Sequence, residues 1–398
     1  MTGWVTTIKR GWVVTDRVPG PDVDEFADPA EVIATLARSP GGGDTLLAAQ
    51  HPHRTPHALT RGLSLAEALP GARDTLDRLR AQAYREVRDV VAPYRVDGPD
   101  GVAIGVLCLV DPAAADSSGR SRVRHSEEIY PRVVAERAAV LAGLGVATSA
   151  AMLVPVRDGA RLTAAVRSSI DGLGAPAASA IDSGGRAHRL WLLGPGPERD
   201  AVLAAAARAP LLVADGNHRL AAAAASGLPG LLALVTAGPE LRVGAIHRGL
   251  VSTGLTADDL ARAWHRAGLV AQKIDDPELP GQPGQVVAQA HGGVLLVRLP
   301  PPGPGEPLPR IDHGLVERLL ISDALGIDPD GPQVRPLPAG HPAGPQVDVV
   351  LRLAPVPFTD VLTVHEQGRR MPRKSTYFTP KPRSGLLLAE LTSADPPR

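Results

Sequence analysis

One apolar segment, Val102–Val110 (VAIGVLCLV), places the tightest constraint on the fold of this chain. It has no charged residue, is rich in β-branched side chains and is bounded by Gly101 and by Asp111-Pro112. Such a run between turn residues predicts a buried strand. Its middle holds Cys108, the only cysteine of the chain, in a poor place for a nucleophile.

Short strands and helices alternate along the rest of the chain, which predicts a mixed α+β fold. Segments with strand character are 151–156, 188–193, 211–214, 294–299 and 348–356. Segments with helix character are 29–38, 64–91 (interrupted at Pro70), 131–144, 198–209, 220–226 and 312–325. Pro- and Gly-rich or small polar stretches predict loops at 113–121, 276–310 and 329–346.

Composition excludes several classes of protein. Lys+Arg and Asp+Glu are both 42, which argues against a general nucleic-acid binder and against a protein of anionic membranes. A single cysteine excludes a disulfide framework and a Cys-rich metal site. No apolar run reaches the length of a bilayer span, and the N-terminus lacks a secretory signal pattern. We therefore expect a cytoplasmic protein.

The sharpest local feature is the turn Asp215-Gly216-Asn217-His218-Arg219, between a strand and an Ala-rich helix. Amides at a helix start point outward without an intrahelical acceptor, and the helix dipole adds partial positive charge. Gly216 permits a tight turn, Arg219 offers a fork for phosphate and His218 a donor or proton carrier. Asp215 has the chemistry to hold a metal or accept a hydroxyl proton. The alternative is an ordinary Asp-Gly turn.

A second feature is the segment MPRKSTYFTPK at 371–381. It holds Lys374 and Lys381, two of only four lysines in the chain. Lys374, Ser375 and Thr376 offer a cation and two hydroxyls to an anion. A polar β-hairpin is the alternative.

Other chemically capable residues are weaker candidates. Arg124 and His125 precede Glu127 and Glu128, so this segment has the groups for acid/base chemistry, although a solvated charged turn is favoured by spacing. His247-Arg248 follows an apolar stretch and is more often structural. Carboxylates near the N-terminus, Asp24 among them, are candidates for a base.

These segments together resemble one family. ADGNHR at 214–219 is similar to its ADGHHR-type signature, and RHSEE with Glu136-Arg137 is similar to its HE…DR segment. HRLWLL, AIHRGL and MPRKSTYFTPK recur in the same order. The family is that catalogued as domain of unknown function 1015, and the resemblance covers roughly residues 60–391. In motif it is related to ParB/sulfiredoxin-like proteins, which include nucleotide-dependent kinases of free serine.

The resemblance implies a ParB/sulfiredoxin-like nucleotide-binding core with additional strands and helices. It implies phosphate contacts from Gly216, Asn217, His218 and Arg219, with Asp215 near the transferred phosphate or its Mg²⁺. Asn217 stands where the family has a His. Either Glu127 or Glu128 is the counterpart of the family's Glu. The position of Arg137 in the HE…DR segment adds it to the candidates.

The predicted division of the chain has four parts. They are an N-terminal segment (1–60), a core with the phosphate-binding turn (61–275), a C-terminal region that returns the MPRKSTYFTPK motif to the site (276–391) and a tail (392–398).

The predicted function is a kinase that moves a phosphoryl group from ATP or ADP to the hydroxyl of a free amino acid, with L-serine favoured. A nucleotide-binding ParB-like regulatory module and a phosphate-ester hydrolase are the alternatives. The expected ligands are Mg²⁺, a nucleoside di- or triphosphate and a small-molecule substrate, with no nucleic acid and no membrane as partner. The sequence does not define the oligomeric state.

Overall fold

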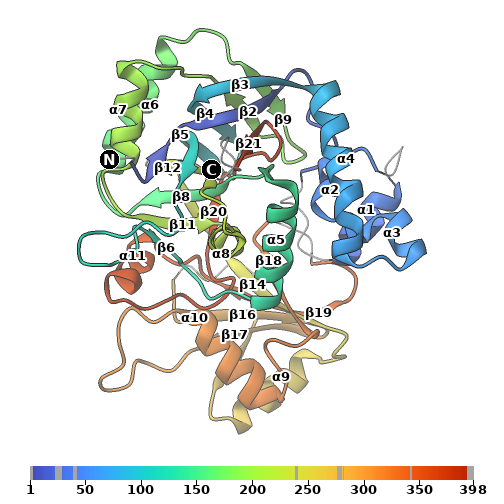
Figure 1. Ribbon diagram of the computed structural model, residues 1–398. Coiled ribbons are helices and arrows are strands. Elements are labelled where there is room, and N and C mark those ends of the chain that lie inside the picture. Colours follow the sequence, from blue (N-terminus) through green and yellow to red (C-terminus); the bar gives the residue numbers. More distant parts are fainter. Residues whose placement is uncertain are drawn as a thin grey trace. The chain divides into compact units, whose positions relative to one another are not determined.

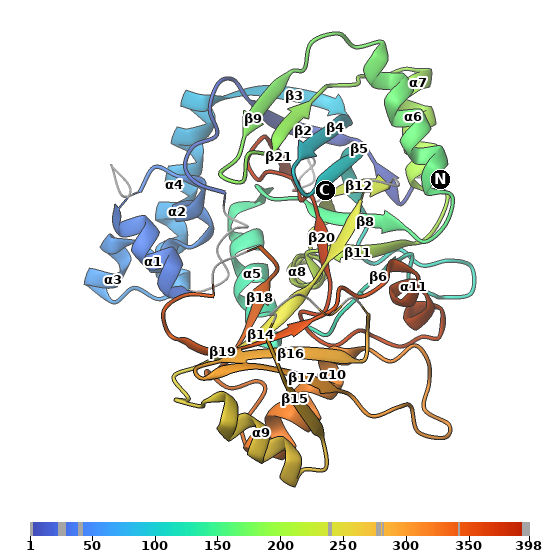
Figure 2. The same ribbon diagram turned by 180° about the vertical axis from the view of Figure 1, so that it is seen from behind.

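The computed structural model describes residues 3–22, 29–38, 43–237, 241–275, 280, 282–340 and 343–391. The chain divides into two compact units. The first combines residues 1–125, 129–241 and 379–398, and the second combines 126–128 with 242–378. Figures 1 and 2 label the elements of both units. This division crosses the predicted boundaries at 60/61 and 275/276, since segments distant in sequence share a unit.

Among the described residues, nine strands of the first unit form a mixed sheet. The order is β6-β11-β8-β12-β5-β4-β10-β9, with β1 paired to β5. The strands are β1 (Val5–Thr6), β4 (Ala92–Gly98), β5 (Gly101–Val110), β6 (Val123–Arg124), β8 (Ala151–Pro155), β9 (Ala178–Ile181), β10 (Ala187–Leu190), β11 (Leu211–Asp215) and β12 (Leu231–Ala237).

Strand β5 is the centre of this sheet and confirms the prediction of a buried strand. It pairs with β4 and β12 along most of its length and with β1 near its end. Cys108 is fully buried there, and burial raises the pKa of its thiol to about 12.

A four-stranded antiparallel sheet completes the strands of the first unit, in the order β3-β2-β21-β7. Its members are β2 (Ile8–Val14), β3 (Tyr84–Val90), β7 (Val146–Ala147) and β21 (Leu387–Glu390). Because β21 pairs with β2, segments near the two chain ends lie side by side. This pairing holds residues 379–391 in the first unit.

Eight α-helices and a short 3-10 turn belong to the described part of the first unit. They are α1 (Pro29–Arg38), α2 (Leu46–Gln50), η2 (Pro52–Arg54), α3 (Pro56–Arg61), α4 (Leu65–Ala83), α5 (Pro131–Leu144), α6 (Gly159–Asp171), α7 (Pro197–Ala206) and α8 (Asn217–Ser226). The helix predicted at 131–144 is confirmed with its ends.

The helix predicted at 64–91 was wrong in two respects. Helix α4 continues through Pro70, which lies in its second turn, and a capping box between Ser64 and Glu67 stabilises its start. The chain then becomes strand β3 at Tyr84. In β3 the buried residues are Tyr84, Val87 and Val90, a spacing of three that imitates a helix.

The second unit is built on a six-stranded antiparallel sheet in the order β15-β17-β16-β19-β14-β18. These strands are β14 (Ile246–Val251), β15 (Val270–Ile274), β16 (Gln285–Ala290), β17 (Gly293–Arg298), β18 (Val334–Pro338) and β19 (Val347–Leu353). The remaining elements are β13 (Arg242–Gly244), α9 (Ala257–Arg266), α10 (Asp312–Leu315), a π-helical stretch η3 (Val316–Asp323), α11 (Phe358–Glu366) and β20 (Tyr377–Thr379). Trp264 of α9 is fully buried in the core of this unit.

Two predicted loops contain strands of this sheet. The stretch 276–310 holds the hairpin β16–β17, and 329–346 holds the edge strand β18. Glycines mark the turn between β16 and β17: Gly292 lies in it and Gly293 begins β17, and both have positive φ. Pro336 and Pro338 lie in an edge strand, where a missing N–H is tolerated. The strand predicted at 294–299 is confirmed as β17, whereas β16 and β18 were not predicted.

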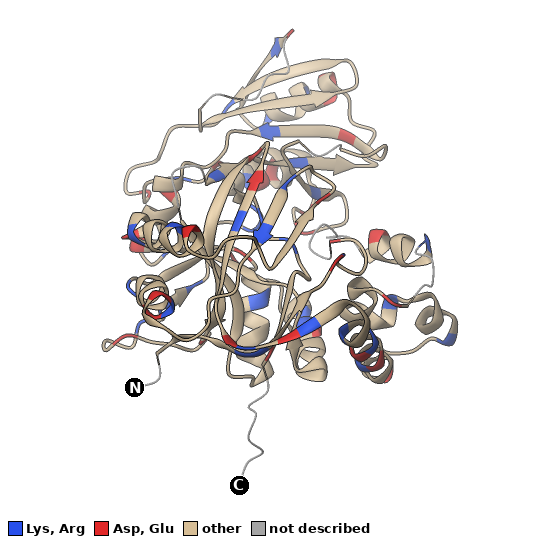
Figure 3. Ribbon diagram, turned by 90° about the horizontal axis from the view of Figure 1, so that it is seen from above, with Lys and Arg blue, Asp and Glu red and all other residues tan. Residues whose placement is uncertain are grey.

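Charges of both signs are interspersed along the chain (Figure 3). Many are paired, as in the bond of 2.8 Å between Arg186 Nη2 and Asp100 Oδ2. None of the helices in the described ranges has both the length and the apolar character required to cross a bilayer.

Candidate functional site

The predicted turn joins strand β11 to helix α8 in the first unit. Strand β11 ends at Asp215, and α8 begins at Asn217, so His218 and Arg219 lie in the first helical turn. Gly216 has φ of +97°, and a Cβ there would lie 2.7 Å from Arg219 Nε and 3.1 Å from Ala151 Cβ. Both strain and crowding therefore favour glycine at this position.

Asp215 lies between two cations, and we call Asp215, Arg219, Lys381 and Ser149 the Asp215 cluster. Lys381 Nζ donates to Asp215 Oδ1 at 2.6 Å, while Arg219 donates to the other carboxylate oxygen and to Ser149 Oγ. The side chains of Asp215 and Lys381 are 23% and 30% exposed. A partly exposed cluster with one more cation than anion is suited to receive an anion.

His218 contacts a residue of the chain preceding α5. Its Nε2 accepts a hydrogen bond of 3.0 Å from the Tyr130 backbone N–H, and the two rings stack at 5.7 Å between centroids. This bond requires an unprotonated Nε2. Protonation of His218 at that atom would break it.

The start of α8 adds backbone polarity to the cluster. Gly216 at the N-cap has no side chain to cap the helix, and Asn217 at the first helical position is buried. The dipole of this ten-residue helix places partial positive charge beside Arg219. Backbone and side chains together define a locus for phosphate or another anion.

Glu127 lies in the second unit with Lys374, Ser375 and Thr376 of the 371–381 motif, whereas Lys381 belongs to the first unit. Its Oε2 accepts from the Lys374 N–H at 2.9 Å, and its Oε1 accepts from the N–H groups of Ser375 (3.1 Å) and Thr376 (2.9 Å). The Thr376 hydroxyl also donates to Oε1, at 2.8 Å. Lys374 has φ of +51°. We call these four residues the Glu127 cradle.

The backbone amides of the Glu127 cradle already have an anion as partner. Consecutive amides around a left-handed residue form a nest that binds anions, and here the anion is the chain's own Glu127 carboxylate. The two hydroxyls that were predicted to bind an anion contact the protein itself, since Ser375 Oγ donates to the Pro372 carbonyl at 2.7 Å and Thr376 Oγ1 donates to Glu127. The Lys374 side chain is exposed.

Arg248 and His247 secure the same part of the second unit. Arg248, 2% exposed, pairs with Glu317 at 2.7 Å and donates to the carbonyls of Arg373 and Lys374. His247 Nδ1 accepts from the Leu353 N–H at 3.2 Å. Burial, then nearby arginines, lowers the pKa of His247 to about 4. These contacts agree with the structural interpretation of both residues.

Three further candidates, Arg124, His125 and Arg137, belong to the first unit. Arg124 belongs to β6, where its Nε donates to the Ser121 carbonyl at 3.5 Å. His125 and Arg137 are half-buried, the latter in α5. Asp24 lies outside the described residues.

Sequence reasoning missed Ser149 and Tyr130. Ser149 contacts Arg219 from 70 positions away and gave no local signal. Tyr130 precedes the helix-opening Pro131 and is one of four tyrosines, which was an available signal.

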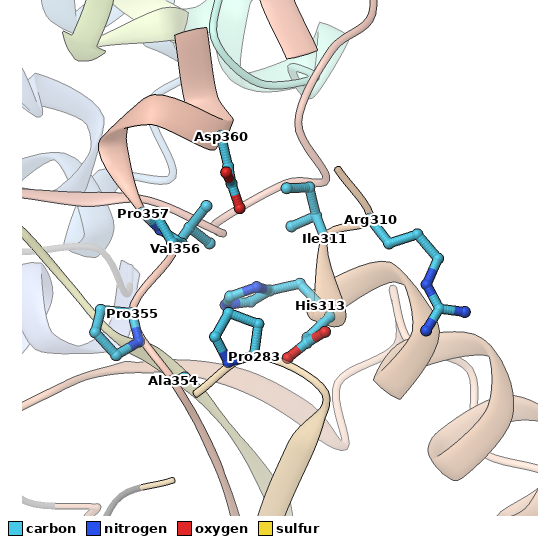
Figure 4. Close-up of a pocket in the computed structure, with 10 residues that line it drawn as sticks. Pro283, Arg310, Ile311, His313, Ala354, Pro355, Val356, Pro357 and Asp360 are labelled. Carbon is cyan, nitrogen blue, oxygen red and sulfur yellow. The ribbon is translucent and has the colours of Figure 1, made fainter. Parts of the chain in front are cut away.

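In the described ranges no group of three or more His, Cys, Asp or Glu side chains could hold a metal ion. Figure 4 shows a small cavity of the second unit, lined by Pro283, by residues 310–313 before and at the start of α10, and by residues 354–357 and Asp360. At about 10 Å³ it has room for roughly one water molecule and no nucleotide.

Comparison with known proteins identifies the family. The chain belongs to the family described as "Protein of unknown function (DUF1015)", which matches residues 69–289, more than half of its length. The family expected from the motifs is thereby confirmed. No curated protein matches the chain.

Several solved structures are similar to this one at low identity. C-terminally truncated SbnI from Staphylococcus aureus has 14% identity and a TM-score of 0.42, covering 73% of this chain and 90% of that chain. A conserved hypothetical protein from Pyrococcus furiosus has 11% identity and a TM-score of 0.38, and the match covers 70% of this chain and 95% of that chain. A free serine kinase in complex with AMP has 11% identity and a TM-score of 0.39, and the match covers 70% of this chain and 92% of that chain. At these scores the likeness carries no functional argument.

Proposed function

We propose that this protein is a phosphotransferase that binds nucleotide phosphates at the Asp215 cluster. The observation that carries the proposal is the pair of cations, Lys381 and Arg219, on the two oxygens of Asp215 at the start of α8. An incoming polyphosphate replaces the carboxylate as the partner of both cations and gains the helix-start amides. Phosphoryl transfer needs this positioning and charge neutralisation more than covalent help from the protein.

The acceptor we propose is the hydroxyl of a free amino acid, with L-serine first. The hydroxyl oxygen forms a bond to the terminal phosphorus, and the bond from phosphorus to the bridging oxygen breaks. The leaving group is ADP from ATP, or AMP from ADP, and the hydroxyl proton passes to a carboxylate or to water. The family resemblance supports this acceptor class.

Magnesium enters the proposal as the ion that the nucleotide carries. Mg²⁺ usually binds one or two carboxylates together with substrate phosphates and waters, and Asp215 fits as one such ligand once Lys381 and Arg219 have turned to phosphate. The ion would neutralise charge on the transferring group. No further ligand among the described residues is assigned.

A second candidate is a nucleotide-binding module with little turnover. Glu127 was predicted to act in acid/base chemistry, but both of its carboxylate oxygens accept hydrogen bonds within the Glu127 cradle. If no other group takes the hydroxyl proton, binding occurs without transfer.

The test is transfer from terminally labelled ATP and ADP to a panel of hydroxyl amino acids. Label in phosphoserine supports the kinase. Label in inorganic phosphate without an acceptor indicates the hydrolase, and tight binding without either product indicates the module. Arg219→Ala and His218→Ala should abolish transfer while melting is preserved. Arg208→Ala, which breaks an exposed pair with Asp158 in the same unit, is the control.

A further inference from the structure

The first unit contains a cavity that the Asp215 cluster does not account for. Its volume is about 450 Å³, within the range of small-molecule pockets. Asp16, Arg17 and Gly20 line one part, residues 179–181 of strand β9 another, and Arg383 a third. We call this space the Arg383 cavity.

The protein holds the Arg383 guanidinium through its two terminal nitrogens. Nη1 donates to the Ser384 carbonyl at 3.1 Å and lies 3.4 Å from Asp22 Oδ1, while Nη2 donates to the Gly20 carbonyl at 3.1 Å. The Nε–H has no partner in the described part of the chain, and Nη2 keeps a second N–H. The Nε–H belongs to the Nε–Nη2 edge of the fork, an edge whose N–H groups match the two oxygens of a carboxylate.

A buried hydrogen-bond chain fixes the position of Arg383. Its backbone N–H donates to the Tyr94 hydroxyl at 3.0 Å, and that oxygen lies 2.8 Å from His188 Nδ1. His188 Nε2 in turn lies 3.2 Å from Asp182 Oδ2. Tyr94 and His188 are 0% and 1% exposed. Since the Arg383 side chain is only 9% exposed, this cation is preorganised rather than mobile.

The open side of the cavity carries one charge of each sign. Asp16 and Arg17 are both exposed, and neither has a hydrogen bond or ion pair with any residue whose placement is described. Ile181, 78% exposed, adds an apolar surface. Two arginines with one unpaired aspartate are complementary to a zwitterion that carries a carboxylate and an ammonium group.

We propose that the Arg383 cavity binds the acceptor of the phosphotransferase as a free α-amino acid. Its carboxylate contacts the open edge of Arg383 together with Arg17, and its ammonium contacts Asp16. This inference rests on the proposed function. Lys381 of the Asp215 cluster and Arg383 are separated by one residue, so their Cα atoms lie within about 7 Å of each other. One short segment therefore supplies a cation to each of the two sites.

A polyphosphate matches this cavity less well. Asp22 already balances Arg383, and Asp16 adds a second carboxylate near the entrance. Like charges would repel a group that bears several negative charges, whereas a zwitterion meets a partner at each end.

The experiment is calorimetric binding of three hydroxyl compounds to the full chain without nucleotide. L-serine should bind, whereas 2-aminoethanol, which lacks the carboxylate, and glycerate, which lacks the ammonium, should each bind at least about tenfold more weakly. Arg17→Ala and Arg383→Lys should weaken L-serine binding about tenfold or more, and Asp16→Asn should weaken it while sparing glycerate. Arg208→Ala should leave it unchanged. Because Arg383 is buried, the exposed Arg17 and Asp16 variants decide the case if Arg383→Lys fails to fold.

The two proposals fail separately. Absence of L-serine binding to the wild type, or equal binding to the Arg17 and Asp16 variants, overturns the Arg383 cavity as the acceptor site. In that case the phosphate site would still be supported if ADP binding is lost in the Lys381 and Arg219 variants and kept in the Arg17 and Asp16 variants. If instead ADP fails to bind the wild type while L-serine binds as predicted, the phosphotransferase fails and the amino-acid site remains.

Discussion

Each unit of this chain surrounds a carboxylate with donors, and the two surroundings differ. In the Asp215 cluster the donors are long side chains, and the carboxylate is 23% exposed. In the Glu127 cradle the donors are mainly backbone amides, and the residue is 8% exposed. Flexible cations in contact with water can exchange one anion for another, whereas buried amides hold their anion as part of the fold. We therefore propose ligand binding for the Asp215 cluster and a structural role for the Glu127 cradle.

The largest expected effect comes from the support of the Glu127 cradle. Arg248→Ala should lower the free energy of unfolding by about 3–5 kcal/mol, because it leaves Glu317 and two carbonyls without their buried partner. Denaturant unfolding measures this. Arg298→Ala, an exposed arginine of the same unit, is the matched control and should cost less than about 0.5 kcal/mol. Equal losses in both variants would contradict a structural clamp.

Acid should destabilise the second unit through His247. Burial lowers the pKa of His247 to about 4. Between about pH 6.5 and 4, therefore, the unfolded chain binds a proton at this residue and the folded chain does not. The contribution of His247 to the free energy of unfolding is therefore complete above about pH 6.5. It falls by about 3 kcal/mol as the pH drops toward 4 and changes little at lower pH.

His247→Gln isolates this contribution. The variant should show a shallower loss of unfolding free energy between pH 6.5 and 4 than the wild type, whatever its stability at pH 7. If the free energy of unfolding falls with pH in parallel in the two proteins, His247 does not cause the acid destabilisation.

Glu127→Ala should cost about 2 kcal/mol, since the buried amides of Ser375 and Thr376 lose their acceptor. Glu127→Gln keeps an amide oxygen in place and should recover part of this loss. In the structural interpretation ADP affinity stays within about twofold of wild type in both variants. A large loss of ADP affinity in Glu127→Gln without loss of stability would indicate that Glu127 belongs to the ligand-binding site.

The smallest stability effect is expected in the Asp215 cluster. Lys381→Met should change the free energy of unfolding by less than about 1 kcal/mol, because its ion pair is partly exposed. Its ADP affinity should nevertheless fall at least about tenfold. Lys9→Met, which removes an exposed lysine–aspartate pair of the same unit, is the control for both measurements. The reverse pattern, with stability lost and affinity kept, would make the cluster structural.

Local sequence chemistry predicted the parts of the site that lie close together in the chain. The strand, the glycine and the helix around Asp215 follow from burial pattern, turn residue and alanine content, and the rarity of lysine singled out Lys381. The contact of Ser149 with Arg219 and that of Arg383 with Tyr94 join segments far apart in the sequence, which local patterns do not encode. Composition likewise identified the turns around β16, β17 and β18 but not their place in a sheet.

The most direct measurement is amide hydrogen exchange resolved by peptide, with and without Mg²⁺–ADP. The account predicts that ADP slows exchange in peptides covering residues 216–220 and leaves those covering 374–376 unchanged, since those amides already bind Glu127. Slowed exchange at 374–376 with none at 216–220 would contradict it.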